Sequence, residues 1–486
     1  MDLVIESGGE KTAGVYRALR EAIVDGRLPV GHRLPATRVL AADLGIGRNS
    51  VATAYERLIA EGYLSARVGA GTFVAPVRAR RRPRRSAADP LRPRAGWTFT
   101  PQPVTSGAAA PRYDFRTGIP DAELFPFDTW RRLVAAEVRL RANSPGTYAE
   151  PSGHPALRAA IARYLGVSRS VHAGPGDVLV TNGTQHALDL IGRVLLRPGD
   201  VVAVEEPGYP PARRLFASLG ARVVGVPVDD EGLVVDALPG HTRLVYATPS
   251  HQFPLGRAMT LARRNALLDW ARRRPAAVVE DDYDSEFRFS ARPLEPLYSL
   301  DAAGRVLYVG TFSKTMLPTV RAGFVLAPPG LQGALAAARQ LGDGYGQVAM
   351  QAALARFIDE GQLARHVRRA GRVYAERHAR IAAALAGQES LELIPSAAGL
   401  HVTALLRDGD AGRAGRVVAA AAKLGVVLDD LGSYIHQDPS SPDSDSHDSD
   451  SHDSNRGAGF VFGFGAAATD RISDGLAVFA DLLRTA

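Results

Sequence analysis

Several polar residues in the second half of the chain lie shortly after apolar runs typical of buried strands. Asp281 and Tyr283 come after AVVE, Lys314 lies in GTFSK after VLYVG, and Arg321 comes seven residues after that lysine. A lysine amine forms a Schiff base with an aldehyde cofactor, and a carboxylate keeps a pyridine nitrogen protonated. Each residue alone reads as an ordinary surface group. Together they predict a site for pyridoxal 5′-phosphate, with Lys314 as the Schiff-base lysine.

A second set of residues suits the phosphate of such a cofactor. Gly183 and the two residues after it follow the apolar run VLVT and open a helix-like stretch. Backbone amides and the dipole at a helix N-terminus bind phosphate, and hydroxyls and a guanidinium can complete the site. The residues expected to bind the phosphate are Gly183, Thr184, Gln185, Thr311, Ser313 and Arg321.

Apolar runs, separated in several places by helix-like stretches, occur throughout the region that carries these residues. This alternation predicts a largely parallel α/β sheet with helices on both faces. In such sheets the functional residues gather at strand ends, which is where the polar groups occur. The runs are VLVT at 178–181, VVAV at 201–204, RVVGVPV at 222–228, LVYA at 244–247, AVVE at 277–280, VLYVG at 306–310 and GFVLA at 323–327.

Residues 11–75 have the pattern of a small DNA-binding module. Apolar residues at helical spacing predict three helices, each closed near a glycine, and YLSARVGAGTFVA then predicts a β-hairpin. The third helix opens with Arg48, Asn49 and Ser50, whose side chains could reach base edges, while Arg38 on the second helix could contact phosphate. A solvated helical domain would explain any single arginine, but it does not explain the complete order of helices and hairpin.

The chain has 486 residues, enough for two or three domains, and its composition is that of a globular protein. It has no cysteine, which excludes disulfides and thiolate metal sites. No metal site is predicted. The net charge of +7 mildly favours a nucleic-acid partner. Because the sequence has no visible signal peptide and no run long enough to span a membrane, we expect a cytoplasmic protein without a membrane partner.

Two segments lack the apolar residues that a core needs. Residues 76–96 hold eight arginines and four prolines, which predicts an extended, self-repelling linker. Residues 436–456 are rich in Asp, Ser and His, which predicts a disordered surface insertion. A His/Asp metal site is the alternative there, but no rigid scaffold underlies it. We therefore expect a DNA-binding domain at 11–75, a large domain at 97–340, and a small domain at 341–486 that carries the insertion.

The N-terminal module resembles the winged helix-turn-helix of the GntR family of bacterial transcription regulators. The resemblance covers RLPATRVLAADLGIGRNSVATAYERLIAEGYLSARVGAGTFV and implies a double-stranded DNA operator as partner. Where the family often has Ser or Thr before the recognition-helix arginine, this chain has Gly47, so one phosphate-binding hydroxyl is missing. The DNA contacts that the resemblance implies are Arg38, Arg48, Asn49, Ser50 and the wing residue Gly69.

The segment from about 113 to 435 is similar to the fold-type I, class I aminotransferases. Together with the winged helix it resembles the MocR subfamily of GntR regulators. The implied fold is multidomain: a winged helix-turn-helix joined to an α/β pyridoxal-phosphate-dependent transferase fold with large and small subdomains. The motifs that carry the likeness are RTGIPDAELFP, GTYAEPSGHPALR, TNGTQHAL, EEPGY, TPSHQFPLG, EDDYDSEFR and GTFSKTMLPTVRAGFV, in this order.

The resemblance also implies roles for single residues. Lys314 matches the Schiff-base lysine, Asp281 the partner of the pyridinium nitrogen, and Tyr283 the partner of the phenolic oxygen. Asp282 is an alternative to Asp281, although the Asp-x-Tyr spacing supports the earlier residue. Tyr209 in EEPGY matches the aromatic residue that stacks on the cofactor ring.

Three further positions concern the partner chain and the ligand. Tyr148 matches a tyrosine that class I enzymes lend to the partner's phosphate, so we expect a domain-swapped homodimer. His251 and Gln252 stand where the enzymes have an asparagine near the ring, and we count Gln252 among the cofactor-binding residues. The stretch 425–436 has no arginine where the enzymes bind the substrate carboxylate. Either another residue recognises the effector, or the effector is not a simple amino acid.

Three functions are compatible with these observations. The first is a regulator that responds to pyridoxal phosphate, or to an amino compound that reacts with it, in vitamin B6 or amino-compound metabolism. The second is a working aminotransferase with an accessory DNA-binding domain, and the third is a regulator with a cofactor-free dimer. Intact Lys314, Asp281, Tyr283 and Arg321 argue against the third. The missing arginine argues against the second, although half-reactions of the transaminase type stay open, so we expect the first.

Overall fold

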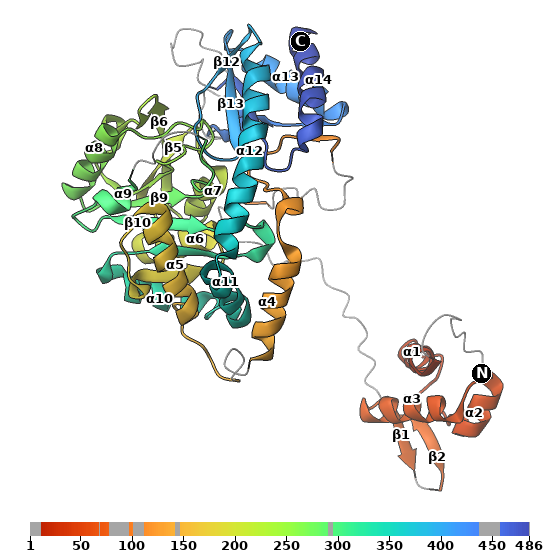
Figure 1. The fold of residues 1–486 in the computed structure, drawn as a ribbon. Coiled ribbons are helices and arrows are strands. Elements are labelled where there is room, and N and C mark those ends of the chain that lie inside the picture. The colour runs from red at the N-terminus through yellow and green to blue at the C-terminus, as the bar shows by residue number, and fades with distance from the viewer. Residues whose placement is uncertain are drawn as a thin grey trace. The chain divides into compact units, whose positions relative to one another are not determined.

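The computed structural model divides the chain into two compact units, Met1–Trp97 and Thr98–Ala486, which are described one at a time (Figure 1). The predicted linker, apart from Pro76, and the predicted insertion, apart from His436, lie outside the described residues. Within the described part of the chain, no helix has the length and apolar character that crossing a membrane requires. The structure describes residues 11–67, 69–76, 97–100, 111–140, 146–289, 295–436 and 457–485.

Three helices and a β-hairpin form the first unit, as predicted. All of them contribute side chains to one apolar core, which includes Val15, Leu40 and Leu58. An antiparallel bridge between Arg33 and Phe73 ties the segment before the second helix to the hairpin. The elements are α1 (Lys11–Val24), α2 (Thr37–Leu44), α3 (Arg48–Ala60), β1 (Leu64–Arg67) and β2 (Gly71–Val74).

An eight-stranded sheet forms the centre of the second unit, in the order β4-β11-β10-β9-β8-β5-β6-β7. The pairs from β10 through β9, β8 and β5 to β6 are parallel, whereas β11 and β7 run antiparallel to their neighbours. The seven predicted runs are all strands of this sheet, and the short edge strand β7 is an addition. The strands are β4 (Val178–Thr181), β5 (Val201–Glu206), β6 (Arg222–Asp229), β7 (Gly232–Leu233), β8 (Thr242–Ala247), β9 (Ala277–Asp282), β10 (Val306–Thr311) and β11 (Gly323–Leu326).

Helices cover both faces of this sheet, as predicted. Because successive side chains of a strand point to opposite faces, Leu179 belongs to the apolar cluster that α6, α7 and α10 share, whereas Val178 and Val180 belong to the cluster that α4, α5 and α11 share. Helices α8 and α9 pack on strands β5, β8, β9 and β10 from the face opposite α6 and α7. The helices are α4 (Phe127–Arg139), α5 (Pro155–Arg169), α6 (Thr184–Leu195), α7 (Pro210–Ser218), α8 (Leu261–Arg272), α9 (Leu297–Leu300), α10 (Pro329–Gly342) and α11 (Val348–Asp359).

A smaller antiparallel sheet, in the order β12-β13-β16-β15, forms a second layer with three helices. The long helix α12 joins the two parts, because its start packs with the large sheet's helices and its middle with the small sheet (Figure 1). A two-stranded parallel pair, β3 with β14, lies beside this layer. The elements are β3 (Tyr113–Asp114), α12 (Gln362–Ala386), β12 (Leu391–Leu393), β13 (His401–Leu406), α13 (Ala411–Lys423), β14 (Val426–Val427), β15 (Asp429–Asp430), β16 (Gly459–Gly463) and α14 (Ile472–Thr485).

Two segments depart from the predicted division at residues 340 and 341. Helix α11 packs its buried face, including Phe357, against α4 and α5 of the large part. Tyr113 and Phe115 belong instead to the core of the small part, because β3 pairs with β14. Residues 113–115 therefore lie with the small part, and the chain crosses to the large part after β3, which the apolar pattern did not reveal.

Candidate cofactor and DNA sites

A cavity of about 680 Å³ opens at the ends of the large sheet's central strands and extends to the small part. This volume suits a small cofactor together with a second small molecule. Gly183, Gln252 and Tyr148 are not among its lining residues. The cavity does bring together nine predicted residues, which are Thr184, Gln185, Tyr209, Asp281, Tyr283, Thr311, Ser313, Lys314 and Arg321.

Lys314 follows β10 and points into the cavity. Its Nζ donates a hydrogen bond to the carbonyl oxygen of Gly118 at 2.7 Å. Burial lowers the pKa of Lys314, against the opposing charges of Asp284 and Asp281. A lower pKa raises the fraction of neutral amine, which is the form that attacks a carbonyl. Gly118 has a φ of 73°, and a Cβ there would lie 2.7 Å from Nζ, so a side chain at this position would collide with the lysine.

Asp281 and Asp282 are neighbours on β9 with different surroundings. Asp281 lines the cavity, and its Oδ2 accepts from the Tyr246 hydroxyl at 2.8 Å, while its buried Oδ1 has no hydrogen-bond partner among the described residues. Burial raises the pKa of Asp281 to about 7. Asp282 instead forms a buried ion pair with Arg169 at 2.7 Å. Both carboxylates keep one unpartnered oxygen, but only Asp281 lines the cavity, so the geometry favours Asp281 over Asp282 as the partner of a protonated pyridine nitrogen.

The opposite end of the cavity supplies donors suited to a phosphate. No side chain caps the N-terminus of α6, which begins after Gly183. The Arg321 guanidinium donates to the Asn182 carbonyl oxygen at 2.6 Å and lies 3.4 Å from the position that a Gly183 Cβ would take. Gly183 therefore contributes no lining side chain but lets the arginine approach the helix start. Uncapped amides beside a guanidinium form an anion site, and Thr311 adds a hydroxyl.

The structure of the loop after β8 corrects the role that was predicted for Gln252. Gln252 is buried, and its amide donates to the carbonyl oxygens of Pro207 and Phe253 at 2.9 and 2.7 Å, while its oxygen accepts from the Leu255 amide at 3.0 Å. Its polar atoms thus hold the loop rather than face the cavity. Phe253 lines the cavity instead, edge-on to Tyr209 with ring centroids 5.6 Å apart. The sequence analysis did not identify Phe253, because a loop has no periodicity that shows which side chain points into the cavity.

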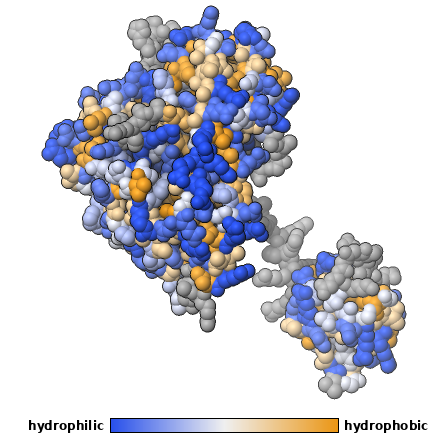
Figure 2. All heavy atoms as spheres, in the orientation of Figure 1, coloured by the Kyte–Doolittle hydropathy of each residue, from blue (hydrophilic) through white to orange (hydrophobic). Residues whose placement is uncertain are grey.

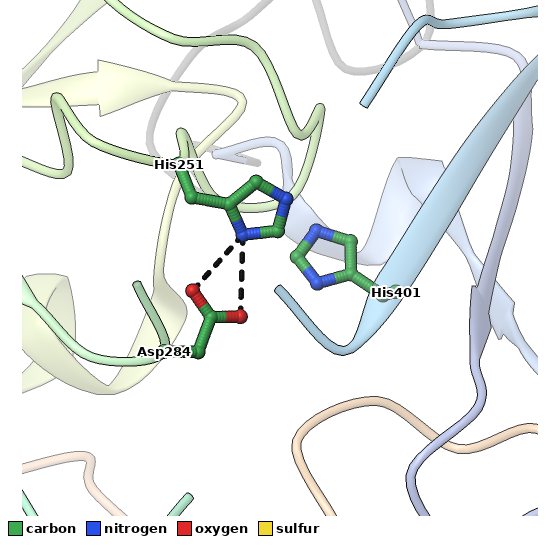
Figure 3. Close-up of side chains that lie close together, drawn as sticks. All are labelled: His251, Asp284 and His401. Carbon is green, nitrogen blue, oxygen red and sulfur yellow. Dashed lines mark hydrogen bonds and ion pairs between the residues drawn. The ribbon is translucent and has the colours of Figure 1, made fainter. Parts of the chain in front are cut away.

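His251, Asp284 and His401 form a buried cluster beside Tyr283 (Figure 3). His251 Nδ1 lies 3.1 Å from Asp284 Oδ1, and the Tyr283 hydroxyl donates to the His251 carbonyl oxygen at 3.0 Å. Burial raises the pKa of Tyr283 well above its usual value, so the hydroxyl stays a donor. Asp284 also accepts from the Leu400 amide at 3.2 Å, so the cluster links Tyr283 to the small part.

The same three side chains have the composition of a metal site, since one potential ligand atom of each lies within 4.8 Å of the others. Hydrogen bonds already occupy both nitrogens of His251, both carboxylate oxygens of Asp284 and Nε2 of His401, however. His251 Nε2 lies 3.1 Å from Ser396 Oγ, and His401 Nε2 lies 2.9 Å from the Pro254 carbonyl oxygen. The network explains their arrangement without a cation.

Tyr148 lies away from the cavity of its own chain. Its side chain is 92% exposed, and the nearest ring is that of Tyr345, with centroids 6.3 Å apart. An exposed tyrosine is available to a second chain, so its role across a dimer stays a prediction.

The predicted DNA-binding residues lie on the surface of the first unit. Arg38, Arg48 and Asn49 are exposed and Ser50 is partly buried, while Gly69 is exposed at the hairpin tip with a φ of 77°. No side chain caps α3 at Gly47, which leaves its first amides available to a phosphate.

The sequence analysis did not single out Arg33 and Arg67, which are also exposed near the hairpin. On the second unit, hydrophilic side chains lie over the first part of α12 (Figure 2). The exposed arginines of this helix are Arg365, Arg368, Arg369, Arg372 and Arg380.

Comparison with known families matches both units. The family model described as bacterial regulatory proteins, gntR family, matches residues 11–74. The model described as aminotransferase class I and II matches residues 121–431.

Similar proteins include both regulators and enzymes. The probable rhizopine catabolism regulatory protein MocR of Rhizobium meliloti is 43% identical over 75% of this chain and 74% of its own length. The HTH-type pyridoxine biosynthesis transcriptional regulator PdxR of Corynebacterium glutamicum is 34% identical over 80% of this chain and 81% of its own. Among solved structures, Pyrococcus horikoshii kynurenine aminotransferase, in complex with PMP, has a TM-score of 0.67 and 28% identity, covering 76% of this chain and 90% of that one.

Proposed function

The chain belongs to the GntR family of transcriptional regulators, in its MocR branch, and we propose that its aminotransferase-like unit senses a small amine or the cofactor itself and thereby sets the DNA binding of its winged helix. Pyridoxal 5′-phosphate is the cofactor of this unit. When bound, it supplies an aldehyde that reacts with primary amines. The observation that carries the proposal is the convergence of Lys314, the open Oδ1 of Asp281 and the uncapped start of α6 on one cavity.

We assign the chain's own residues as follows. Lys314 carries the cofactor covalently, and Asp281 keeps the pyridine nitrogen protonated. The Tyr283 hydroxyl, which donates to the His251 carbonyl oxygen in this structure, would turn its proton to the phenolic oxygen when the cofactor is bound. Tyr209 packs on the ring. The phosphate is bound at the start of α6 by Thr184, Gln185, Thr311, Ser313 and Arg321, with Gly183 allowing the close approach.

For DNA we propose that α3 enters the major groove. Arg48, Asn49 and Ser50 then read base edges, Arg38 binds a phosphate, and the wing touches the backbone near Gly69. The exposure of these side chains supports the assignment. A homodimer with exchanged winged helices fits a linker of 21 residues, which reaches about 65 Å if extended. In such a dimer Tyr148 would complete the partner's phosphate site.

The names of two relatives suggest the regulated metabolism. One is a probable regulator of rhizopine catabolism and the other regulates pyridoxine biosynthesis. We therefore propose that this regulator acts on genes of vitamin B6 or amino-compound metabolism.

Selection of DNA from a random library with the purified full-length protein tests the proposal. We expect a paired half-site, because a symmetric dimer binds two copies of one sequence. Its affinity should change at least severalfold between cofactor-free and cofactor-loaded protein, or on addition of an amine. If no sequence is enriched, the DNA-binding role is wrong. If the operator is bound but neither the cofactor nor any amine changes the affinity, the sensor role is wrong.

A working aminotransferase is the second candidate, because Lys314, Asp281 and Tyr283 together suit that chemistry. Incubation of the loaded protein with amino donors and a keto-acid acceptor separates the two. Repeated turnover would favour the enzyme, whereas a single half-reaction, or none, would favour the sensor.

A further inference from the structure

The end of the cavity nearest the small part has a consistent hydrogen-bonding character. We call it the effector end and define it by Thr117, His401, Asp429, Ser433 and Tyr434, all of which line the cavity. His401 and Tyr434 both pack on Phe253, with ring centroids 5.4 and 5.1 Å away. These residues come from β13, from β15 and the turn after it, and from the loop after β3, and none was predicted from the sequence.

Asp429 offers this end an open acceptor. Its Oδ2 accepts three hydrogen bonds, from the Thr117 amide at 3.1 Å, the Thr117 hydroxyl at 2.8 Å and the Tyr434 hydroxyl at 2.9 Å. For Oδ1, the described part of the chain supplies no hydrogen-bond donor. One oxygen therefore fixes the carboxylate in place while the other is left for a ligand.

The remaining polar groups at this end also accept rather than donate. The hydroxyls of Thr117 and Tyr434 both donate hydrogen bonds to Asp429, and Ser433 Oγ donates to the Asp430 carbonyl oxygen at 2.7 Å. A hydroxyl that has donated its proton offers only lone pairs to a ligand.

His401 also offers a ligand an acceptor rather than a donor. A carbonyl oxygen can only accept, so His401 Nε2 carries the proton that it shares with Pro254, and Nδ1 is left as an acceptor. Burial lowers the pKa of His401 well below its usual value, helped by His251 and Lys314, so the ring stays neutral. The side chain is only 1% exposed and lines the cavity, so the acceptor that His401 can offer a ligand is Nδ1.

The cations of the cavity are all engaged by other groups, although Arg116 also interacts with the charge of Asp429. Among the described lining residues these are Lys314, Arg321 and Arg116. Lys314 lies at the cofactor and Arg321 at the phosphate end. Asp114 holds the Arg116 guanidinium through two hydrogen bonds of 2.8 and 2.6 Å. A ligand carboxylate at the effector end would therefore face the negative charge of Asp429 and the lone pairs of several acceptors, which repel it.

We propose that the effector is a primary amine whose other polar groups donate hydrogen bonds, a second ammonium or a hydroxyl, and that Asp429 and His401 select it against amino acids. This inference rests on the sensor function proposed above and adds the chemical class of the ligand. It also explains why the stretch after β14 carries no arginine.

Three ligands of one length test the inference: 1,4-diaminobutane, 4-aminobutan-1-ol and 4-aminobutanoate, each with its homologues one carbon shorter and longer. Calorimetric titration of the cofactor-loaded, full-length protein should give the diamine and the amino alcohol at least about tenfold tighter binding than the amino acid, which is ~1.4 kcal/mol. Operator affinity is measured in parallel with each ligand.

Asp429→Asn keeps an oxygen for Thr117 and Tyr434 but removes the charge. This substitution should lower the affinity for the diamine about tenfold, and the affinity for 4-aminobutanoate should stay the same or increase. Asp430→Asn is the matched control, because it removes the same charge one residue along, outside the cavity lining, and should change none of the affinities. Thermal unfolding of both variants checks that the fold is kept.

Each outcome decides a different point. Tightest binding of 4-aminobutanoate by the parent protein overturns the inference, as does an equal loss for all three ligands in Asp429→Asn. If no ligand of the series binds, the inference is overturned as well. If the predicted order of affinities holds but operator affinity never changes, the inference stands and the proposed sensor function fails.

Discussion

Replacing Asp281 by Asn should stabilise the cofactor-free protein while it weakens cofactor binding. The reason is that the buried carboxyl has a pKa of about 7, raised from 3.8 chiefly by burial. Below pH 3.8 the folded and unfolded chains both hold the proton. As the pH rises towards 7 the unfolded chain has released it and the folded protein has not, so the parent loses stability, and above 7 the loss is complete.

The size of the effect follows from these two values. Each pH unit between them corresponds to ~1.4 kcal/mol, so the upper bound is roughly 4 kcal/mol. We expect Asp281→Asn to gain about 2–4 kcal/mol over the parent at pH 8 and about 1–2 kcal/mol at pH 5. Urea unfolding between pH 5 and 8, followed by the fluorescence of the buried Trp270, measures the difference. Cofactor affinity should fall about 10–100-fold, since a charge-assisted hydrogen bond is lost.

Asp282→Asn is the control, because the same substitution one residue along should lower the stability of the folded protein instead of raising it. Burial alone would raise the pKa of Asp282, but Arg169 beside it holds the pKa below its usual value. Breaking this buried pair should cost about 3–5 kcal/mol, and the deficit should be constant from pH 5 to 8, above the range where the carboxyl titrates. If Asp281→Asn is no more stable than the parent at pH 8, or if its gain does not vary with pH, the argument is wrong.

Three further predictions concern the other proposed roles. Lys314→Ala should abolish the yellow colour and the borohydride-reducible cofactor attachment seen with the parent, and an adduct that persists in this variant would exclude Lys314. Arg48→Ala should cost on the order of 1–3 kcal/mol at the selected operator but little on unrelated DNA at matched salt, and unchanged operator affinity would mean that α3 is not the recognition helix. Mixed dimers of Lys314→Ala and Tyr148→Phe, verified by mass, should regain one intact cofactor site, and no recovery would end the role of Tyr148 across the dimer.

Much of the candidate cofactor site was predictable because it lies on long, buried elements. Parallel strands that are covered on both faces need continuous apolar runs, so all seven runs became strands. The carboxyl ends of parallel neighbours meet at one edge, and this brings Asp281 at the end of β9 close to Lys314 after β10. Strand β7 was not predicted, because a strand of two residues shows no periodicity.

The effector end was not predictable, for the opposite reason. Its residues stand singly on short elements, and Thr117 bonds to Asp429 across a separation of 312 residues. No local pattern brings two such positions together. The missing arginine was only a negative signal. The acceptors that stand in its place became visible only in the structure, where β15 lies beside the loop after β3.

The two ends of the cavity therefore differ in polarity for a topological reason. The large sheet supplies the start of a helix and Arg321, both of which donate to an anion. The small part supplies acceptors from short strands and turns, led by Asp429. A ligand with an anion at one end and donors at the other fits in one orientation only. Because the two ends belong to different layers of the fold, the small part can change which amine is selected while the cofactor contacts of the large sheet stay the same.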